Sequence, residues 1–585
     1  MDLNKMDDCT SPLTPEFYIF LLFGMSLPLI FFFLITKRSR NQSNACWRLL
    51  QHVFQGAIKS EFIPELQEVL AIQGPEITTL PATSRDEHET TPMLTAIQNG
   101  SCEVVVFLRE LGVDVNLHGT FEWRGVKYDN VSPLCAAIIS RQADIVDEFV
   151  VVEEEQLDKV TADMEGIKAS SIPTEQKIEA LELMGAAYVF YRYSPSLVSS
   201  SYAISIWKEA TRLRLSTVDG EQAIPKTISP PSDLFVKAMG FTSEFLTLEH
   251  LEQLEAQLDF DDDYPELNLY TQALLVIQRI LDQSDPEQHK YILLQLCNHA
   301  DRLHCEDHYN RAINIGMFML DEFQGFEEWD DEVNDIIIRT IGILVESFAK
   351  LKDVPSSEFT FTNVMTTLEN TLKVNHNLVN ISEYQEFDLL IFDLIDFLTE
   401  MLPTLSKEES HQFKQIVYEF IRADYRFDRV DKGNILHLAC CNLFADLIGP
   451  KRFRINLMKL LLELDVDPNF TSTNGKTALH ILANSFQWER WSETTNITDA
   501  VQLLLDSGAN IDQPDGKGKT CLDLFKLKEK DLNDKGKPSK YLQKLINRVR
   551  LRPLKCLAAQ VIRRNRIPFV PGDLPKSLLT FVNRH

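Results

Sequence analysis

The sequence predicts an all-α fold, a helical-repeat solenoid built from stacked pairs of short helices. Short blocks of related sequence recur near both ends of the chain. Between them, apolar residues recur at the three-to-four-residue spacing of helices. A third observation is an apolar stripe in the last segment, which predicts a helix that a partner can bind in a groove.

The composition excludes some broad classes of protein. The 585 residues are 44% hydrophobic and 25% charged, which is enough apolar material for a large core. The net charge of −28 argues against a general nucleic-acid binder. Residues 537–585 hold twelve Lys or Arg and a single acidic residue, so a basic tail follows an acidic body. This asymmetry predicts two kinds of partner surface, and solvated charge that maintains solubility is an equally weighted alternative.

The N-terminal region has its own character. After a tail at residues 1–16, residues 17–36 are twenty uncharged residues, long enough to span a bilayer core of about 30 Å. Basic residues follow this segment and acidic ones precede it, which would place the rest of the chain in the cytosol. The alternatives are a spurious exon joined to a soluble protein and, less favoured, a cleaved signal peptide, whose leading region should be basic.

The recurring blocks share one design. A turn leads to Thr, Ser or Asn, a helix with small residues such as Ala136 and Ala137 follows, and a second helix is rich in Leu and Val. This pattern resembles the ankyrin repeat, in which the Thr or Ser caps the first helix. We therefore expect ankyrin repeats at 44–155 and at 430–530. His437 and His480 occupy positions at which the repeat uses histidine to tie turns together.

The middle of the chain, residues 174–425, lacks the ankyrin signatures but is strongly helical in pattern. Segments such as 178–187, 202–213 and 291–320 have helical spacing, and their pairing resembles tetratricopeptide helix hairpins. An acidic loop is expected at 259–266. Both repeat types present a concave surface to peptides or proteins.

The C-terminal segment, 545–585, is the most informative part of the chain. Its first predicted helix begins at Pro553, and one face collects five apolar residues, namely Leu554, Leu557, Ala558, Val561 and Ile562. A second short helix follows a turn at Pro571-Gly572 and offers five more, namely Leu574, Pro575, Leu578, Phe581 and Val582. A terminal helix hairpin that caps the repeat array is the structural alternative.

This segment resembles a von Hippel–Lindau box. The resemblance implies that the first helix binds elongin B/C and that the second binds cullin-2. The usual motif has Cys where Ala558 lies, but binding of a helix in a groove depends more on the apolar face than on that one sulfur.

The order of the parts resembles the feminization-1 homologue family over residues 45–585. Segments 121–137, 178–186 and 554–562 look like landmarks of that family. The resemblance implies three ligase partners (elongin B/C, cullin-2 and its RING subunit) and a protein substrate with a short C-terminal degron, often ending in Arg, bound by the N-terminal ankyrin array. Here that array is shorter than in the family, and the acidic position that the family uses in its third repeat has no counterpart.

The insertion in the N-terminal repeats supplies the candidate substrate-binding residues, which are Phe121, Glu122, Trp123 and Tyr128. An aromatic ring beside a carboxylate suits a basic peptide end. The alternative, which we favour, is that the three aromatic rings pack the loop between repeats, because aromatic side chains bury large areas.

No catalytic centre, metal site or cofactor site is predicted. The Gly518-Lys519-Thr520 triplet imitates a phosphate-binding loop but has Gln513 where the motif needs Gly, so an ankyrin turn is the better interpretation. The histidines and cysteines between 297 and 308 lack paired zinc-ligand spacing, and a polar helix turn is simpler than a metal-dependent enzyme.

The expected function is therefore that of a non-catalytic substrate-recognition adaptor of a cullin-2–elongin B/C RING ubiquitin ligase, which directs proteins to proteasomal degradation. The alternative is a membrane-tethered ankyrin and tetratricopeptide scaffold without ligase function. The absence of paired cysteine spacing among ten cysteines fits a reducing cytoplasmic or nuclear location, with the repeats facing the cytosol if residues 17–36 are an anchor.

Overall fold

The computed structural model describes the chain from residue 90 to residue 535 with gaps, and a few positions beyond. The described segments are 90–110, 113–115, 117–123, 125–149, 157–169, 172–190, 197–215, 224–226, 233–240, 244–258, 264–281, 285–325, 331–377, 387–423, 426–427, 430–441, 454–484, 497–535, 542–543, 546–547, 558–559, 561–562, 567 and 582. The predicted membrane span at 17–36 and the first part of the N-terminal ankyrin array lie outside them. Within the described segments, no helix is long and apolar enough to cross a membrane.

The chain divides into two compact units. The first comprises Met1–Ser232 with Phe241–Leu296, and the second comprises Asp233–Gly240 with Cys297–His585. The division runs through helix α16 (Pro286–Cys305), inside the predicted tetratricopeptide-like region 174–425.

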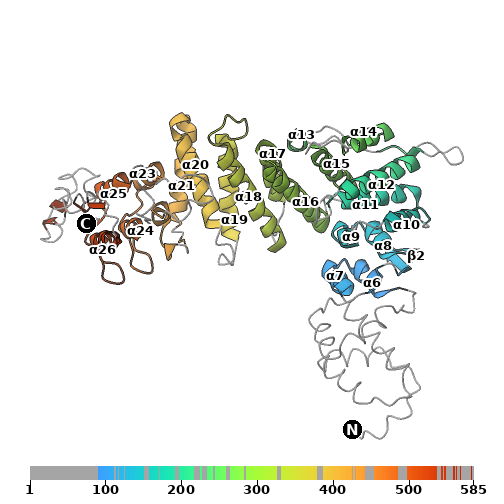
Figure 1. The fold of residues 1–585 in the computed structure, drawn as a ribbon, viewed down its shortest axis with the longest axis horizontal. Coiled ribbons are helices and arrows are strands. Elements are labelled where there is room, and N and C mark those ends of the chain that lie inside the picture. The colour runs from blue at the N-terminus through green and yellow to red at the C-terminus, as the bar shows by residue number, and fades with distance from the viewer. Residues whose placement is uncertain are drawn as a thin grey trace, which may run out of the picture. The chain divides into compact units, whose positions relative to one another are not determined.

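The first unit begins with two helix pairs in the predicted ankyrin region (Figure 1). They are α6 (Pro92–Asn99) with α7 (Cys102–Glu110), and α8 (Pro133–Ile139) with α9 (Ala143–Phe149). The Thr91 hydroxyl accepts from the backbone N–H of Leu94, and the Ser132 hydroxyl accepts from that of Cys135, so both first helices have side-chain N-caps. Ala136 and Ala137 are fully buried, and small residues of this kind let neighbouring helices pack closely.

A two-stranded antiparallel hairpin, which we did not predict from the sequence, joins these helix pairs. It consists of β1 (Gly119–Trp123) and β2 (Val126–Val131), with Gly125 at a φ of 78° in the turn. Phe121 is fully buried and its neighbour Glu122 is exposed, which is the two-residue alternation of a strand with one covered face. The segment is too short for that alternation to stand out among the helical patterns around it.

Further helices, most of them longer, follow in the described part of the first unit. They are α10 (Leu157–Ala169), α11 (Thr174–Phe190), α12 (Leu197–Leu215), α14 (Leu248–Leu258) and α15 (Tyr264–Ile280). Helices α11 and α12 make the most extensive packing in the unit, and α15 covers another side of α11. Trp207 of α12 is fully buried and lies directly against Gly185 of α11, because no side chain at residue 185 occupies that space.

The second unit opens with a helical stack. Its elements are α13 (Asp233–Met239), α17 (Tyr309–Glu322), η3 (Phe323–Gly325), α18 (Asp331–Leu351), α19 (Phe361–Asn377), α20 (Phe387–Met401), η5 (Leu402–Thr404) and α21 (Lys407–Arg422). From α17 to α20 each helix contacts the next, α13 contacts α17, and α18 also contacts α20 (Figure 1). Ser406 and Glu409 form a capping box at the start of α21, in which each side chain bonds the other's backbone N–H.

The C-terminal ankyrin region follows the stack. Its helices are α22 (Ile435–Ala439), α23 (Ile455–Glu463), α24 (Ala478–Asn484), α25 (Ile497–Asp506) and α26 (Cys521–Asp534). Side chains of Asn434 and Thr520 cap α22 and α26. The prediction of an all-α helical-repeat fold is confirmed, with the hairpin at 119–131 as a local exception.

Candidate interaction surfaces

The first predicted tail helix exposes part of its apolar face. Leu554 and Leu557 lie outside the described residues. Ala558, Val561 and Ile562 are helical, and their spacing of three and four residues puts them on one face. Ala558 is exposed, Val561 is 51% exposed and Ile562 is partly exposed.

A side of the same helix next to this face is covered by the protein. Ala559 is only 1% exposed, and it lies about a quarter of a turn from Ala558. Upstream, Leu542 and Ile546 are buried at a spacing of four residues, which marks another covered helical face. The tail therefore has one face toward the protein and an accessible face that contains described members of the predicted stripe.

The second predicted tail helix is less accessible where it is described. Leu574, Pro575, Leu578 and Phe581 lie outside the described residues. Val582 is helical and 4% exposed. The protein covers the Val582 side chain in this structure, and its contact with cullin-2 stays a prediction.

The hairpin brings the four candidate substrate-binding residues together but exposes only two of them. Phe121 pairs with Tyr128 across the strands, and both side chains are buried. Glu122 is exposed, and Trp123 is partly exposed and stacks on Phe121 with ring centroids 6.4 Å apart. Phe121 and Tyr128 therefore pack inside the loop between repeats, whereas Glu122 and part of Trp123 are accessible to a ligand.

The hairpin is attached to the first helix pair. The Thr90 hydroxyl donates to the Thr120 carbonyl over 3.0 Å, just before α6 begins. Lys127 lies opposite Glu122 in the register, and both are exposed. A basic ligand would therefore meet Glu122 beside a cation of the protein itself, which weakens the electrostatic attraction of that edge.

A buried ion cluster lies in the helical part of the first unit. Three cations surround two carboxylates, and the members are Glu182, Arg214, Lys226, Glu244 and Arg279. The side chains of Glu182 and Glu244 are 1% and 2% exposed. Burial alone would raise the pKa of Glu182, but the charges of Lys226, Arg279 and Arg214 outweigh it and the pKa is lowered.

The cluster fixes chain segments that are far apart in sequence. Lys226 Nζ donates to the Phe245 carbonyl over 2.9 Å and lies 3.7 Å above the centre of the Phe245 ring. Arg214 donates to the Pro225 carbonyl as well as to Glu182. Because its described polar groups bond one another, the cluster is a structural clamp. This cluster was not predictable from the sequence, since no local pattern marks its members.

The C-terminal ankyrin turns are tied together by histidine, as expected. His437 Nε2 lies 3.0 Å from the Lys476 carbonyl, and His480 Nε2 lies 3.1 Å from the Lys519 carbonyl. The other ring nitrogen of His437 lies 2.7 Å from Oδ1 of Asn434, which caps the same helix, and that of His480 lies 2.8 Å from the Thr477 hydroxyl. Each imidazole thus links one turn to the next.

The two sequence patterns that imitate chemical sites have structural roles. Thr520 caps α26, so the Gly518-Lys519-Thr520 triplet is a repeat turn. His304 lies 2.9 Å from the Ser347 hydroxyl and 3.3 Å from a Glu346 carboxylate oxygen. Among the described residues, no group of three or more His, Cys, Asp or Glu is arranged to hold a metal ion.

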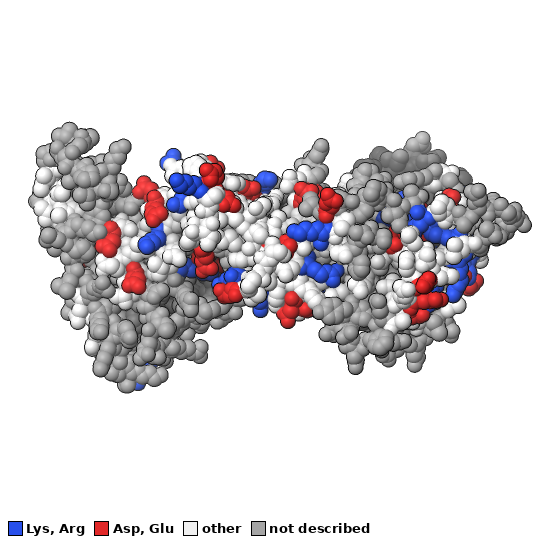
Figure 2. Space-filling view, turned by 90° about the horizontal axis from the view of Figure 1, so that it is seen from above, with Lys and Arg blue, Asp and Glu red and all other residues white. Residues whose placement is uncertain are grey.

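Charged side chains of both signs are interspersed on the face shown in Figure 2. The described part of that face shows no broad field of a single sign.

Comparison with known proteins supports the repeat assignment and the resemblance. The Ankyrin repeat family model matches residues 474–516. The chain is 26% identical to Protein fem-1 homolog C of Mus musculus over 428 residues, which is 70% of this chain and 61% of that protein. It is 27% identical to Protein fem-1 homolog C of Homo sapiens over 430 residues, with the same shares.

A longer match extends to a second relative. The chain is 24% identical to Protein fem-1 homolog A-A of Mus musculus over 531 residues, which is 83% of this chain and 71% of that protein. The resemblance to the feminization-1 homologue family is thus confirmed. It spans 61% of the length of the homolog C proteins that it matches.

Proposed function

We propose, from this relationship to the Fem-1 homologues, that the chain is the substrate-recognition adaptor of a cullin-2–elongin B/C RING ubiquitin ligase. The tail binds elongin B/C and cullin-2, and the repeats hold a protein substrate near a ubiquitin-carrying enzyme that a separate RING subunit recruits. The adaptor contributes proximity and orientation, and no bond is broken by its own residues. This function places the repeats in the cytosol or nucleus.

The accessible apolar face of the tail helix is the observation that supports this proposal most. Val561 is 51% exposed, whereas Ala559 on another side of the helix is 1% exposed. A helix that only capped the repeats would turn its apolar stripe inward, because burial of a large aliphatic side chain is worth about 1.5–3 kcal/mol. An outward stripe of Ala558, Val561 and Ile562 fits a partner groove instead.

Substrate binding is proposed at the N-terminal repeats. The accessible edge of the hairpin offers the Glu122 carboxylate and part of the Trp123 ring, two groups that attract a basic peptide end. The length of the array upstream of α6 determines how much more of the substrate is held, and that region lies outside the described residues.

Co-expression with elongin B/C and cullin-2 tests the proposal. The wild-type chain is expected to elute with all three subunits in size-exclusion chromatography. Val561→Asp and the double variant Leu554→Asp/Leu557→Asp are expected to weaken elongin capture at least tenfold, because a carboxylate in an apolar groove costs more than about 1.4 kcal/mol.

Ile567→Asp is the matched control. Ile567 is 45% exposed and follows the helix outside the stripe, so this variant is expected to retain the elongins. Separate elution of the wild-type chain would favour the alternative, a membrane-tethered scaffold without ligase function. Elongin capture by the double variant would show that another segment makes the contact.

A further inference from the structure

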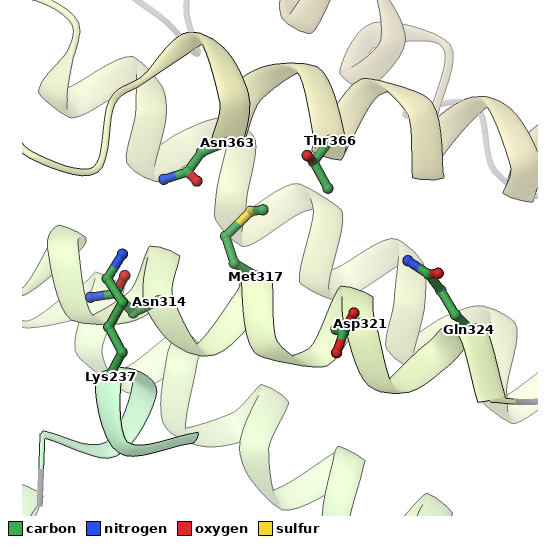
Figure 3. Close-up of a pocket in the computed structure, with 7 residues that line it drawn as sticks. All are labelled: Lys237, Asn314, Met317, Asp321, Gln324, Asn363 and Thr366. Carbon is green, nitrogen blue, oxygen red and sulfur yellow. The ribbon is translucent and has the colours of Figure 1, made fainter. Parts of the chain in front are cut away.

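The second unit contains a polar groove that the proposed function does not use. It lies between α17 and α19, with Lys237 of α13 at one end (Figure 3). The residues that line it are Lys237, Asn314, Met317, Asp321, Gln324, Asn363 and Thr366. Its volume is about 200 Å³. This is less than sites that enclose a drug-sized ligand, which begin at about 300 Å³.

One wall of the groove is a single face of α17 and its short extension η3. Residues 314, 317, 321 and 324 follow one another at spacings of three and four, so their side chains form one row. Ten helical residues rise about 15 Å. An extended chain covers that distance in roughly four or five residues. The groove therefore has the length of a short peptide strand.

The polar side chains of the row have no partner among the described residues. Among the described residues, no hydrogen bond or ion pair involves the side chains of Asn314, Asp321 or Gln324. A primary amide offers both donors and an acceptor, so it can pair with the C=O and N–H of an extended backbone. Met317 lies between these groups as a partly exposed, deformable apolar surface.

The opposite wall is held in place by contacts within the unit. Asn363 Nδ2 donates to the Glu358 carbonyl over 2.8 Å, and the Asn363 backbone N–H donates to the Thr360 hydroxyl over 3.2 Å. Across the groove, the Thr367 hydroxyl lies 3.7 Å from the Met317 sulfur. These contacts preform the groove, which reduces the entropy lost when a peptide is ordered.

The charged side chains of the groove favour a ligand with a positive charge. Lys237 Nζ lies 2.8 Å from a Glu358 carboxylate oxygen, so its charge is compensated. Asp321 is exposed and no cation of the described residues pairs with it. The carboxylate of Asp321 is therefore the charge that a ligand meets.

We propose that this groove binds an extended peptide segment of about four or five residues with a Lys or Arg side chain placed at Asp321. The amides of Asn314 and Gln324 pair with the peptide backbone, and Met317 contacts an apolar or small side chain between them. This inference stands apart from the proposed function, because it needs neither elongin nor cullin. It gives the adaptor a peptide-binding surface separate from its N-terminal repeats.

A peptide array tests the inference with the full chain. The probes are immobilised dodecapeptides of randomised sequence, scored for binding by wild type and by three variants. Wild type is expected to select peptides with a basic residue. Asp321→Lys is expected to bind these peptides at least about tenfold more weakly and to favour acidic ones, because it replaces attraction by repulsion.

The other variants separate backbone recognition from charge and from misfolding. Asn314→Ala is expected to weaken all selected peptides about threefold to tenfold, because one hydrogen-bonding group is lost whatever the peptide side chains are. Asp335→Lys makes the same charge change at an exposed position of α18 outside the groove and is expected to bind as wild type does.

Equal binding by wild type and Asp321→Lys would overturn the proposal, as would an array on which wild type selects nothing. Equal melting temperatures of the four proteins establish that the comparison is made between folded chains. None of these outcomes depends on elongin capture, so failure here is distinguishable from failure of the proposed function.

Discussion

Arg279 Nη2 donates to Glu182 Oε2 over 2.7 Å, although the two residues are 97 positions apart in the sequence. Glu182 lies on α11 and Arg279 lies near the end of α15. Both belong to the buried ion cluster, in which two carboxylates neutralise three cations only in part. The cluster is therefore sensitive to the loss of either carboxylate.

We expect Glu182→Gln to destabilise the first unit by about 3–5 kcal/mol, because three buried cations would then share Glu244. Amide hydrogen exchange detected by mass spectrometry measures this loss of stability, and α11 and α12 are expected to exchange faster than in wild type. Glu179→Gln is the control. Glu179 pairs with Arg141 at 34% side-chain exposure, so its loss is expected to cost less than about 1 kcal/mol. Equal effects of the two variants would contradict a clamp role for the cluster.

Gly185→Ala is expected to destabilise the first unit by about 1–3 kcal/mol, even though alanine is the better helix former. A Cβ at residue 185 would collide with the Trp207 indole, whose Nε1 donates to the Glu182 carbonyl. Gly166→Ala is the matched control, since a Cβ there meets nothing within 4 Å, and it is expected to stabilise α10 by about 0.5–1 kcal/mol. Thermal melts of both variants show whether each one is more or less stable than wild type. A Gly185→Ala variant more stable than wild type would contradict the tight packing of Trp207 against residue 185.

Acidification is expected to weaken the C-terminal ankyrin region through His437. Burial lowers the pKa of His437 from 6.5 to about 4, with a smaller opposing effect from its bond to the Lys476 carbonyl. Between about pH 4 and pH 6.5 the unfolded chain binds a proton at His437 and the folded chain does not. The contribution of His437 to the free energy of unfolding is therefore fully present above about pH 6.5 and is lost as the pH falls toward about 4. The expected loss from pH 7 to pH 5 is about 2 kcal/mol.

The variant His437→Asn isolates this contribution. It is expected to be less stable at pH 7 and to show a flatter dependence of urea stability on pH than wild type. His411→Gln, at an exposed position of α21, is expected to keep the wild-type slope. Parallel wild-type and His437→Asn profiles would show that His437 does not titrate on unfolding.

Local features of the fold were predictable because they depend on neighbours in sequence. Thr91 and Ser132 cap their helices three residues before the bonded N–H groups, and His437 occupies a fixed place in its repeat turn. The stripe of the tail was equally visible, because i, i+3 and i+4 residues share a helix face whatever the rest of the chain does. Its exposure at Val561, however, is a property of the folded chain.

Long-range features were not predictable in the same way. The hairpin that buries Phe121 and Tyr128 depends on cover from α6, and the peptide groove depends on α17 and α19 lying side by side. The buried position of Val582 likewise shows only in the structure. Periodicity shows which apolar residues share one face of a helix, but it does not show whether the protein or a partner covers that face.

The repeat class, the helix caps and the tail stripe follow from local sequence patterns, because hydrogen bonds and spacing within one or two helical turns specify them. Tertiary structure decided which charges meet in the buried cluster, which aromatic rings of the hairpin are covered and where a groove opens between helices. These depend on contacts between segments tens of residues apart, and such contacts form only when the helices stack.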